Sequence, residues 1–279
     1  MDARILIAVM VGLVLVAFGG FYFALSPRSS DAPFPSVQTA TPFSPAAPPV
    51  APLPPVPPAP PPMATVESVE AEILLSEYAE LLAFVKNNFN AEYNEMLAAA
   101  VRRRNEGASD QMFGQELAER FQDIMRGKLK YGAGATMATI DRLAANEASL
   151  FHALGTEGAG FCLKALGKDD APAAGVPPES VRQLMQLGTL YRFQAIVEGM
   201  ANAKPVAPIT AEETRAFEAS LAREGINFKD VSSGAFLKAS LEPGKPCLTL
   251  ETFHLAIARL PDGTRRKIYV GMFFVGRDR

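Results

Sequence analysis

PPESVRQLMQLGTLYRFQAIVEGMAN, residues 177–202, predicts a long helix that packs closely against its neighbours. The two prolines have a fixed φ and no N–H, which suits the first turn of a helix. Behind them apolar positions recur near the 3.6-residue period of an amphipathic helix, namely Val181, Leu184, Leu187 or Gly188, Tyr191 and Ala195. Gly188 and Gly199 each cost about 1 kcal/mol relative to alanine inside a helix. We therefore expect another helix to approach closely at both glycines.

Helical periodicity also covers the residues upstream. Residues 66–104 predict a single amphipathic helix, with one face formed by Leu74, Tyr78, Leu81, Val85, Phe89, Tyr93, Met96 and Ala100. Ser109 or Asp110 is expected to cap a second helix. Its apolar face carries Phe113, Leu117, Phe121, Ile124 and Met125. A third helix is predicted over residues 137–154, between two glycine-rich breaks.

A change of period follows the last predicted helix. Thr210 and Glu213 have the spacing of a capping box, and Gly225 suits the position after a helix C-terminus. Apolar residues then alternate, as in half-buried strands, at Ala235, Leu237, Ala239 and Leu241, at Phe253, Leu255 and Ile257, and at Ile268, Val270, Met272 and Phe274. The predicted fold class is α+β and predominantly helical, with helices to about residue 225 and a small antiparallel β-meander over about residues 235–275.

Residues 5–25, ILIAVMVGLVLVAFGGFYFAL, contain no charged side chain. A helix of that length crosses a hydrocarbon core of about 30 Å, so residues 1–26 predict a single-pass transmembrane anchor. A cleaved signal peptide is the alternative, with a passable cleavage site at residues 17–19. We expect export of the C-terminal domain, because Asp31 is the single charge in residues 29–65 and the cysteine count is even.

Residues 27–65 form a proline-rich linker that contains 15 of the 23 prolines. Proline fixes φ and lacks an N–H, so the linker predicts an extended polyproline II spacer with a reach on the order of 100 Å. A PxxP ligand is the alternative, but it needs basic neighbours, which residues 32–65 lack. The order of anchor, spacer and globular domain (residues 66–279) is similar to that of TonB-like and other bitopic cell-envelope proteins, a likeness of layout alone.

Few side chains supply catalytic or metal chemistry, since the chain has two cysteines, two histidines and a net charge of −3. No zinc-ligand spacing is present, and the net charge argues against a nucleic-acid partner, which would favour a strongly basic face. No metal, cofactor or nucleic-acid partner is therefore expected. Cys162 and Cys247 are expected to form a disulfide, with two free buried thiols as the next possibility. A weaker catalytic alternative pairs Cys162 with His152 or His254 as a thiol nucleophile and its base.

These observations favour a membrane-anchored cell-envelope protein whose exported helical domain binds another protein or the cell wall and is not an enzyme. The runner-up is a membrane-tethered hydrolase that uses the Cys–His pair or carboxylates. A cleft containing a Cys–His pair would favour the hydrolase, and an exposed apolar groove on the helices would favour the binding module.

Overall fold

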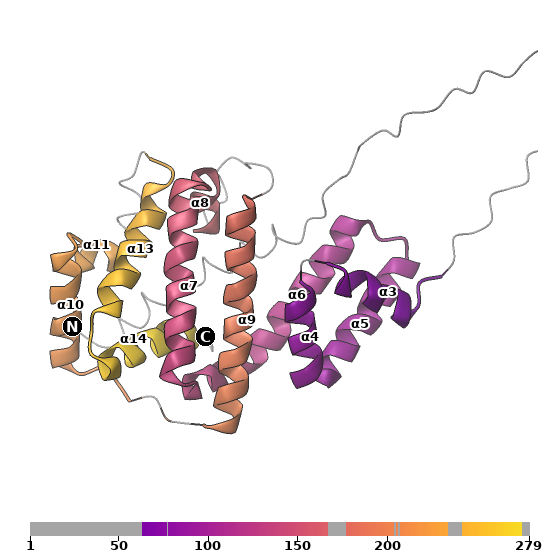
Figure 1. Cartoon of the computed structure of the whole chain (residues 1–279), viewed down its shortest axis with the longest axis horizontal. Helices are drawn as coiled ribbons and strands as arrows, with labels where there is room; N and C mark the ends of the chain where they lie inside the picture. The colour runs from indigo at the N-terminus through magenta and orange to yellow at the C-terminus, as the bar shows by residue number, and fades with distance from the viewer. Residues whose placement is uncertain are drawn as a thin grey trace, which may run out of the picture.

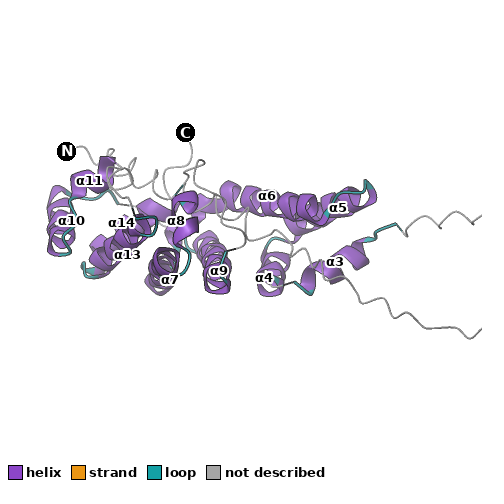
Figure 2. Ribbon diagram, turned by 90° about the horizontal axis from the view of Figure 1, so that it is seen from above, coloured by secondary structure: helices purple, strands orange, loops and turns teal. Residues whose placement is uncertain are grey.

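The computed structural model describes residues 63–274, except residues 77, 167–176, 204, 206 and 234–241. Every regular element in this part of the chain is a helix (Figure 2). Within it, no helix combines the length and the apolarity needed to cross a membrane. The predicted anchor (residues 1–26) and the predicted spacer up to residue 62 lie outside the described residues.

The helices form two regions that lie side by side (Figure 1). The N-terminal region consists of α3 (Val66–Leu74), α4 (Ala79–Asn88), α5 (Asn90–Asn105) and α6 (Asp110–Lys128). The short 3-10 helix η1 (Leu129–Gly134) leads into the C-terminal region, which contains α7 (Met137–Thr156), α8 (Ala159–Ala165), α9 (Glu179–Ala201), α10 (Ala211–Arg223), α11 (Phe228–Ser233), α13 (Lys245–Ala258) and α14 (Asp262–Phe274). Seen from above, α10, α13, α7, α9 and α4 form a row, with α5 and α6 in a second layer over α4 (Figure 2).

The predicted helix over residues 66–104 is three helices, so the prediction is wrong about continuity. After α3, the Ser76 hydroxyl donates to a carbonyl three residues earlier at 2.6 Å and accepts from the Tyr78 N–H at 3.2 Å, which competes with helical hydrogen bonding. Between α4 and α5, Phe89 leaves the helical conformation at φ −136° and ψ 50°. The predicted inward face is nevertheless buried, apart from Leu74. The apolar period therefore found the core but missed the two turns.

The predicted helix ends are confirmed. The Ser109 hydroxyl accepts from the Met112 N–H at 3.3 Å and caps α6, whose predicted apolar face is buried. Thr210 and Glu213 form the expected capping box of α10. Gly225 follows this helix with φ 72°, a left-handed conformation that glycine adopts without a steric penalty.

The predicted β-meander is wrong, and the described residues are all-helical rather than α+β. The second and third predicted strands are parts of α13 and α14, and residues 235–241 lie outside the described residues. In α13, Leu255 is 45% exposed whereas Phe253 and Ile257 are buried, which contradicts a shared strand face. In α14, every residue from Ile268 to Phe274 is buried. In a short run in which nearly every residue is apolar, the period cannot distinguish a buried helix from a buried strand.

Close contacts at glycines hold α7 between α9 and α13 (Figure 1). A Cβ atom on Gly199 of α9 would overlap the Tyr131 carbonyl of η1, and one on Gly188 would crowd α7. At the other end of α7, a Cβ on Gly244 would overlap the Gly155 carbonyl. The close approach predicted at both α9 glycines is confirmed. Because the end of α7 meets the start of α13, these two helices run antiparallel.

Candidate functional site

The two cysteines lie together at one end of the C-terminal region. Cys162 of α8 and Cys247 of α13 form a disulfide with an S–S distance of 2.11 Å and a Cα–Cα distance of 5.9 Å, across 85 residues of sequence. Both residues are fully buried. A disulfide carries no thiolate, and the thiolate is the nucleophilic form of cysteine. In this state neither sulfur can act as the nucleophile of the catalytic alternative.

His152 lies on the outer side of α7, with its side chain 57% exposed. Its Nδ1 is 3.0 Å from Oε2 of Glu251, which belongs to α13. This contact joins two neighbouring helices at their surface. The structure pairs His152 with a carboxylate and Cys162 with Cys247, so the predicted thiol–imidazole pair is not formed.

His254 points from α13 into the core and is 3% exposed. Its ring stacks with those of Tyr269 and Phe273 of α14, at centroid distances of 5.8 and 6.3 Å, and lies 5.7 Å from the ring of Phe151 of α7. Its Nδ1 is buried without a hydrogen-bond partner. Burial lowers the pKa of His254 to about 3, and the positive charge of Arg192 contributes to the shift. The ring is therefore uncharged at neutral pH.

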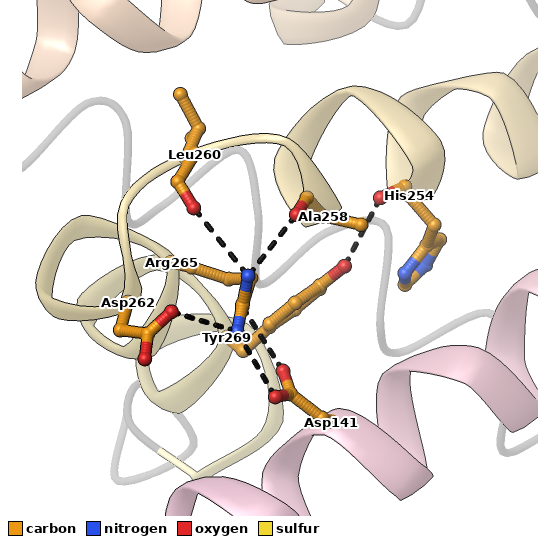
Figure 3. Close-up of polar contacts among 7 residues, drawn as sticks. All are labelled: Asp141, His254, Ala258, Leu260, Asp262, Arg265 and Tyr269. Atoms are coloured by element: carbon orange, nitrogen blue, oxygen red, sulfur yellow. Dashed lines mark hydrogen bonds and ion pairs between the residues drawn. The ribbon is translucent and has the colours of Figure 1, made fainter.

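The backbone of His254 belongs to a polar network at the turn between α13 and α14 (Figure 3). The Tyr269 hydroxyl donates to the His254 carbonyl at 3.1 Å. Arg265 donates to the carbonyl of Ala258, the last residue of α13, at 3.1 Å and to that of Leu260, just after the helix, at 3.4 Å. It also pairs with Asp141 of α7 at 3.0 Å. Desolvation and then the charge of Asp141 raise the pKa of Tyr269, so its hydroxyl remains a donor. The network satisfies carbonyls that a helix end leaves unpaired, and it attaches the turn to α7.

A buried ion pair connects α9 with α7 in the same core. The Arg192 guanidinium donates to the Glu147 carboxylate, and both side chains are buried. The guanidinium also lies 6.0 Å from the ring centroid of Phe273. Removing one partner of such a pair typically costs about 3–5 kcal/mol, because the other charge stays buried. This pair therefore has a structural role in holding α9 against α7.

Glu198 near the end of α9 caps the start of α7. Its carboxylate accepts hydrogen bonds from the Thr136 N–H at 2.9 Å, the Thr136 hydroxyl at 3.0 Å and the Thr139 hydroxyl at 2.6 Å. Burial raises the pKa of Glu198, but the hydrogen bonds from Thr139 and Thr136 and the charge of Arg142 outweigh it and lower the pKa below its usual value. The carboxylate is therefore ionised at a helix N-terminus, where a negative charge is favourable.

A cleft of about 470 Å³ lies between the α10–α11 connection and α13. This volume is within the range of small-molecule sites. Its lining is mixed, and includes Glu224, Ile226, Asn227, Asp230, Val231, Glu242, Lys245, Leu248, Thr249 and Thr252. Glu224 forms an ion pair with Arg259, and the Thr249 and Thr252 hydroxyls donate to carbonyls of α13. Neither cysteine and neither histidine lines this cleft, so it does not provide the predicted catalytic pair.

Sequence reasoning missed the buried ion pair, although each partner has a local signal. Arg192 lies on the predicted inward face of α9, four residues after Gly188 and three before Ala195. Glu147 lies at helical spacing from Leu143 and Leu150, which are both buried. A charged residue on an apolar helix face requires a partner, since a lone charge is rarely buried. That rule identifies both residues as candidates but does not say that they meet.

Comparisons with known proteins add no assignment. No protein-family model, no curated protein and no solved structure matches this chain. Among the described residues, no group of three or more His, Cys, Asp or Glu side chains could hold a metal ion. The described part of the chain is a helical domain with one disulfide and with several polar side chains buried in its apolar core.

Proposed function

We propose that the chain is a membrane-anchored cell-envelope protein whose exported helical domain acts by binding another protein or the cell wall. One observation carries the choice of a binding module over a thiol hydrolase. All four Cys and His side chains of the chain take part in contacts between helices: Cys162 with Cys247, His152 with Glu251, and His254 with the rings of α14 and α7. The side chains that a Cys–His mechanism needs therefore hold the fold.

The proposed anchor and spacer rest on the sequence. Residues 5–25 are uncharged and long enough to span a bilayer, and residues 27–65 are too rich in proline to form a helix or a sheet. The first helix of the domain begins directly after this linker, at Val66, with Thr65 as its N-cap. A disulfide between Cys162 and Cys247 suits an oxidising compartment, which supports export of the domain.

Crosslinking in intact cells tests this proposal. A photo-crosslinking residue replaces Thr249 in the cleft of the full-length protein, and a second variant carries it at Arg126, an exposed position of α6. We expect at least one position to give a discrete crosslinked species with an envelope protein or with peptidoglycan. The matched control is a chain of residues 1–65 that carries the photo-crosslinking residue at Thr65, and it should give none. Identical products from the control would contradict a binding role for the helical domain.

Topology and catalysis have separate readouts. A reporter that is active only outside the cytoplasm, fused after Arg279, is expected to be active. Activity of a cytosolic reporter alone would contradict export. A thiol-reactive active-site probe applied to the unreduced protein is expected to label neither Cys162 nor Cys247. Labelling that is lost in Cys162→Ser would instead favour the hydrolase.

A further inference from the structure

The residues around His254 form one buried junction of four helices. This junction, here called the His254 junction, consists of Glu147 and Phe151 of α7, Arg192 of α9, His254 of α13, and Tyr269 and Phe273 of α14. We propose that the His254 junction is an acid-operated lock, in which protonation of the His254 ring releases α14 and the C-terminal end of α13 from α7. The inference does not depend on the proposed binding function.

The geometry makes a charged ring unfavourable at this position. Aromatic rings from α7 and α14 pack around the imidazole, and its Nδ1 has no acceptor for an added proton. The positive charge of Arg192 also acts on the ring and opposes a second positive charge. A buried charge without a partner is among the most costly groups in a protein core. Protonation therefore opposes the packed state.

The neighbouring carboxylates already have other partners. On α7, Glu147 accepts from Arg192 and Asp141 pairs with Arg265. On α13 itself, Glu251 lies against His152 at the surface. A carboxylate of this kind would have to leave its present partner before it could neutralise a protonated His254.

The remaining elements packed against α13 also supply no counterion in the described contacts. On α10, Glu213 pairs with Lys267 of α14, and Glu224 after its end pairs with Arg259. On α8, Cys162 is in the disulfide and carries no charge. On α14, the Tyr269 hydroxyl is a neutral donor to the His254 carbonyl.

The direction of the pH effect follows from these surroundings. The pKa of His254 is about 3 in the folded state, below the ordinary value of 6.5. Above pH 6.5 the ring is neutral in both states, so its contribution to folding is fully present. As the pH falls from 6.5 towards 3, the unfolded or opened state takes up a proton that the folded state excludes. The equilibrium constant for closing falls by up to about tenfold per pH unit, or about 50-fold between pH 6.5 and 4.5.

The disulfide limits which segment can open. Cys247 lies at the start of α13 and is tied to α8, whereas His254 and the turn to α14 lie beyond it. The segment that protonation can release is therefore about residues 251–274. The N-terminal region contacts Phe193 of α9 through the rings of Phe89 and Phe121. None of these three residues belongs to the His254 junction, so the helices of the N-terminal region should stay packed.

Hydrogen exchange on the full-length protein tests the lock. Exchange is measured at pH 7.5, 6.5, 5.5 and 4.5 and corrected for its intrinsic pH dependence. We expect protection in residues 251–274 to fall about 50-fold between pH 6.5 and 4.5, while α3–α6 keep theirs. His254→Phe, which keeps an aromatic ring but cannot be protonated, should remove this dependence. His152→Gln, at the other histidine of the chain, should behave as the wild type.

Equal acid sensitivity in His254→Phe and the wild type would overturn the proposal. If His254→Phe does not fold, an NMR pH titration of the wild-type protein still tests the proposal, because the chain has only two histidine rings to assign. The His254 ring should stay neutral down to pH 4.5 for as long as the protein is folded. Titration of the His254 ring near pH 6.5 in the folded protein would exclude the lock.

Discussion

The two regions of this molecule are both helical, but polar side chains have different places in them. In the N-terminal region, interhelical ion pairs lie at or near the surface, such as Lys86–Glu70, Lys128–Glu92 and Arg103–Glu116. In the C-terminal region one such pair, Arg192–Glu147, lies in the core. Every buried polar or charged residue identified in the described part of the chain belongs to this region, namely Thr139, Asn146, Glu147, Thr189, Arg192, Ser220, His254 and Thr264.

This difference determines how each region responds to a change. A surface ion pair contributes about 0–1 kcal/mol, because solvent screens it and two long side chains are ordered. A buried polar group without its partner costs the full desolvation penalty. The N-terminal region should therefore tolerate charge changes that the C-terminal region does not. The regions meet at Phe193 of α9, whose ring lies 5.5 Å from Phe89 and 6.3 Å from Phe121.

The largest expected effect is loss of the disulfide in the C-terminal region. Opening a cross-link that spans 85 residues costs about 4–5 kcal/mol in the chain-entropy model. We expect the Cys162→Ser/Cys247→Ser double variant to lose about this much in urea unfolding. Alkylation of the denatured, unreduced wild type should modify neither cysteine. Two alkylated cysteines would show that the disulfide is absent.

The next effect is loss of the buried ion pair. Arg192→Met leaves the Glu147 carboxylate buried without its partner, and should lower the free energy of unfolding by about 3–5 kcal/mol. Arg192→Met combined with Glu147→Leu removes both charges and should recover most of that loss. Urea unfolding of the single and double variants measures the difference. A loss below about 1 kcal/mol in Arg192→Met would mean that the pair is not enclosed by the core.

A matched pair of glycines compares helix packing in the two regions. Gly199→Ala places a Cβ against the Tyr131 carbonyl of η1, and should destabilise by about 1–3 kcal/mol despite the better helix propensity of alanine. Gly127 lies in α6, where an added Cβ would meet no neighbouring group within 4 Å, so Gly127→Ala should stabilise by up to about 1 kcal/mol. Thermal unfolding of both variants compares them. The same sign of change at both positions would contradict the close contact at Gly199.

The smallest effect is expected at the surface of the N-terminal region. Lys86 hydrogen-bonds Glu70 at 2.7 Å, and the Tyr93 hydroxyl donates to the same carboxylate at 3.0 Å. These hydrogen bonds lower the pKa of Glu70. Lys86→Met should cost less than about 1 kcal/mol at pH 7.

The pH dependence of this small effect has a definite sign. Because the pKa of Glu70 is lowered on folding, its contribution is present above the ordinary carboxyl pKa and is lost as the pH falls through the folded value. The wild type and Lys86→Met should therefore converge in acid, as measured by urea unfolding. A difference between them that grows as the pH falls would contradict this pairing.

Local features of the sequence were sufficient to predict most helices and their ends. Ser109, Thr210 and Gly225 act within a few residues of their own position, so a single sequence shows their effect. Apolar periodicity also identified most of the buried face over residues 66–104. It could not show the turns around Ser76 and Phe89, because an inward face keeps the same spacing across a short break.

Apolar periodicity could not predict the secondary structure of a segment that is buried on every side. Residues 268–274 are apolar at both odd and even positions, so any subset of them can look alternating. Their helical state depends on contacts with α7, η1 and α13, which no local pattern contains. In α13 the misleading residue was Leu255. This exposed leucine lies between the buried Phe253 and Ile257, so the three residues looked like alternate positions of a strand.

The sequence by itself determined where most helices begin and end and where the proline-rich linker stops. It also determined which four side chains could carry sulfur or imidazole chemistry. Only the tertiary structure decided their roles. It paired Cys162 with Cys247, placed His152 at the surface beside Glu251, and enclosed His254 in aromatic rings. The reason is distance along the chain, since these contacts join residues 15 to 103 positions apart. Local propensity acts over one or two turns, whereas burial and pairing are set by the packing of whole helices.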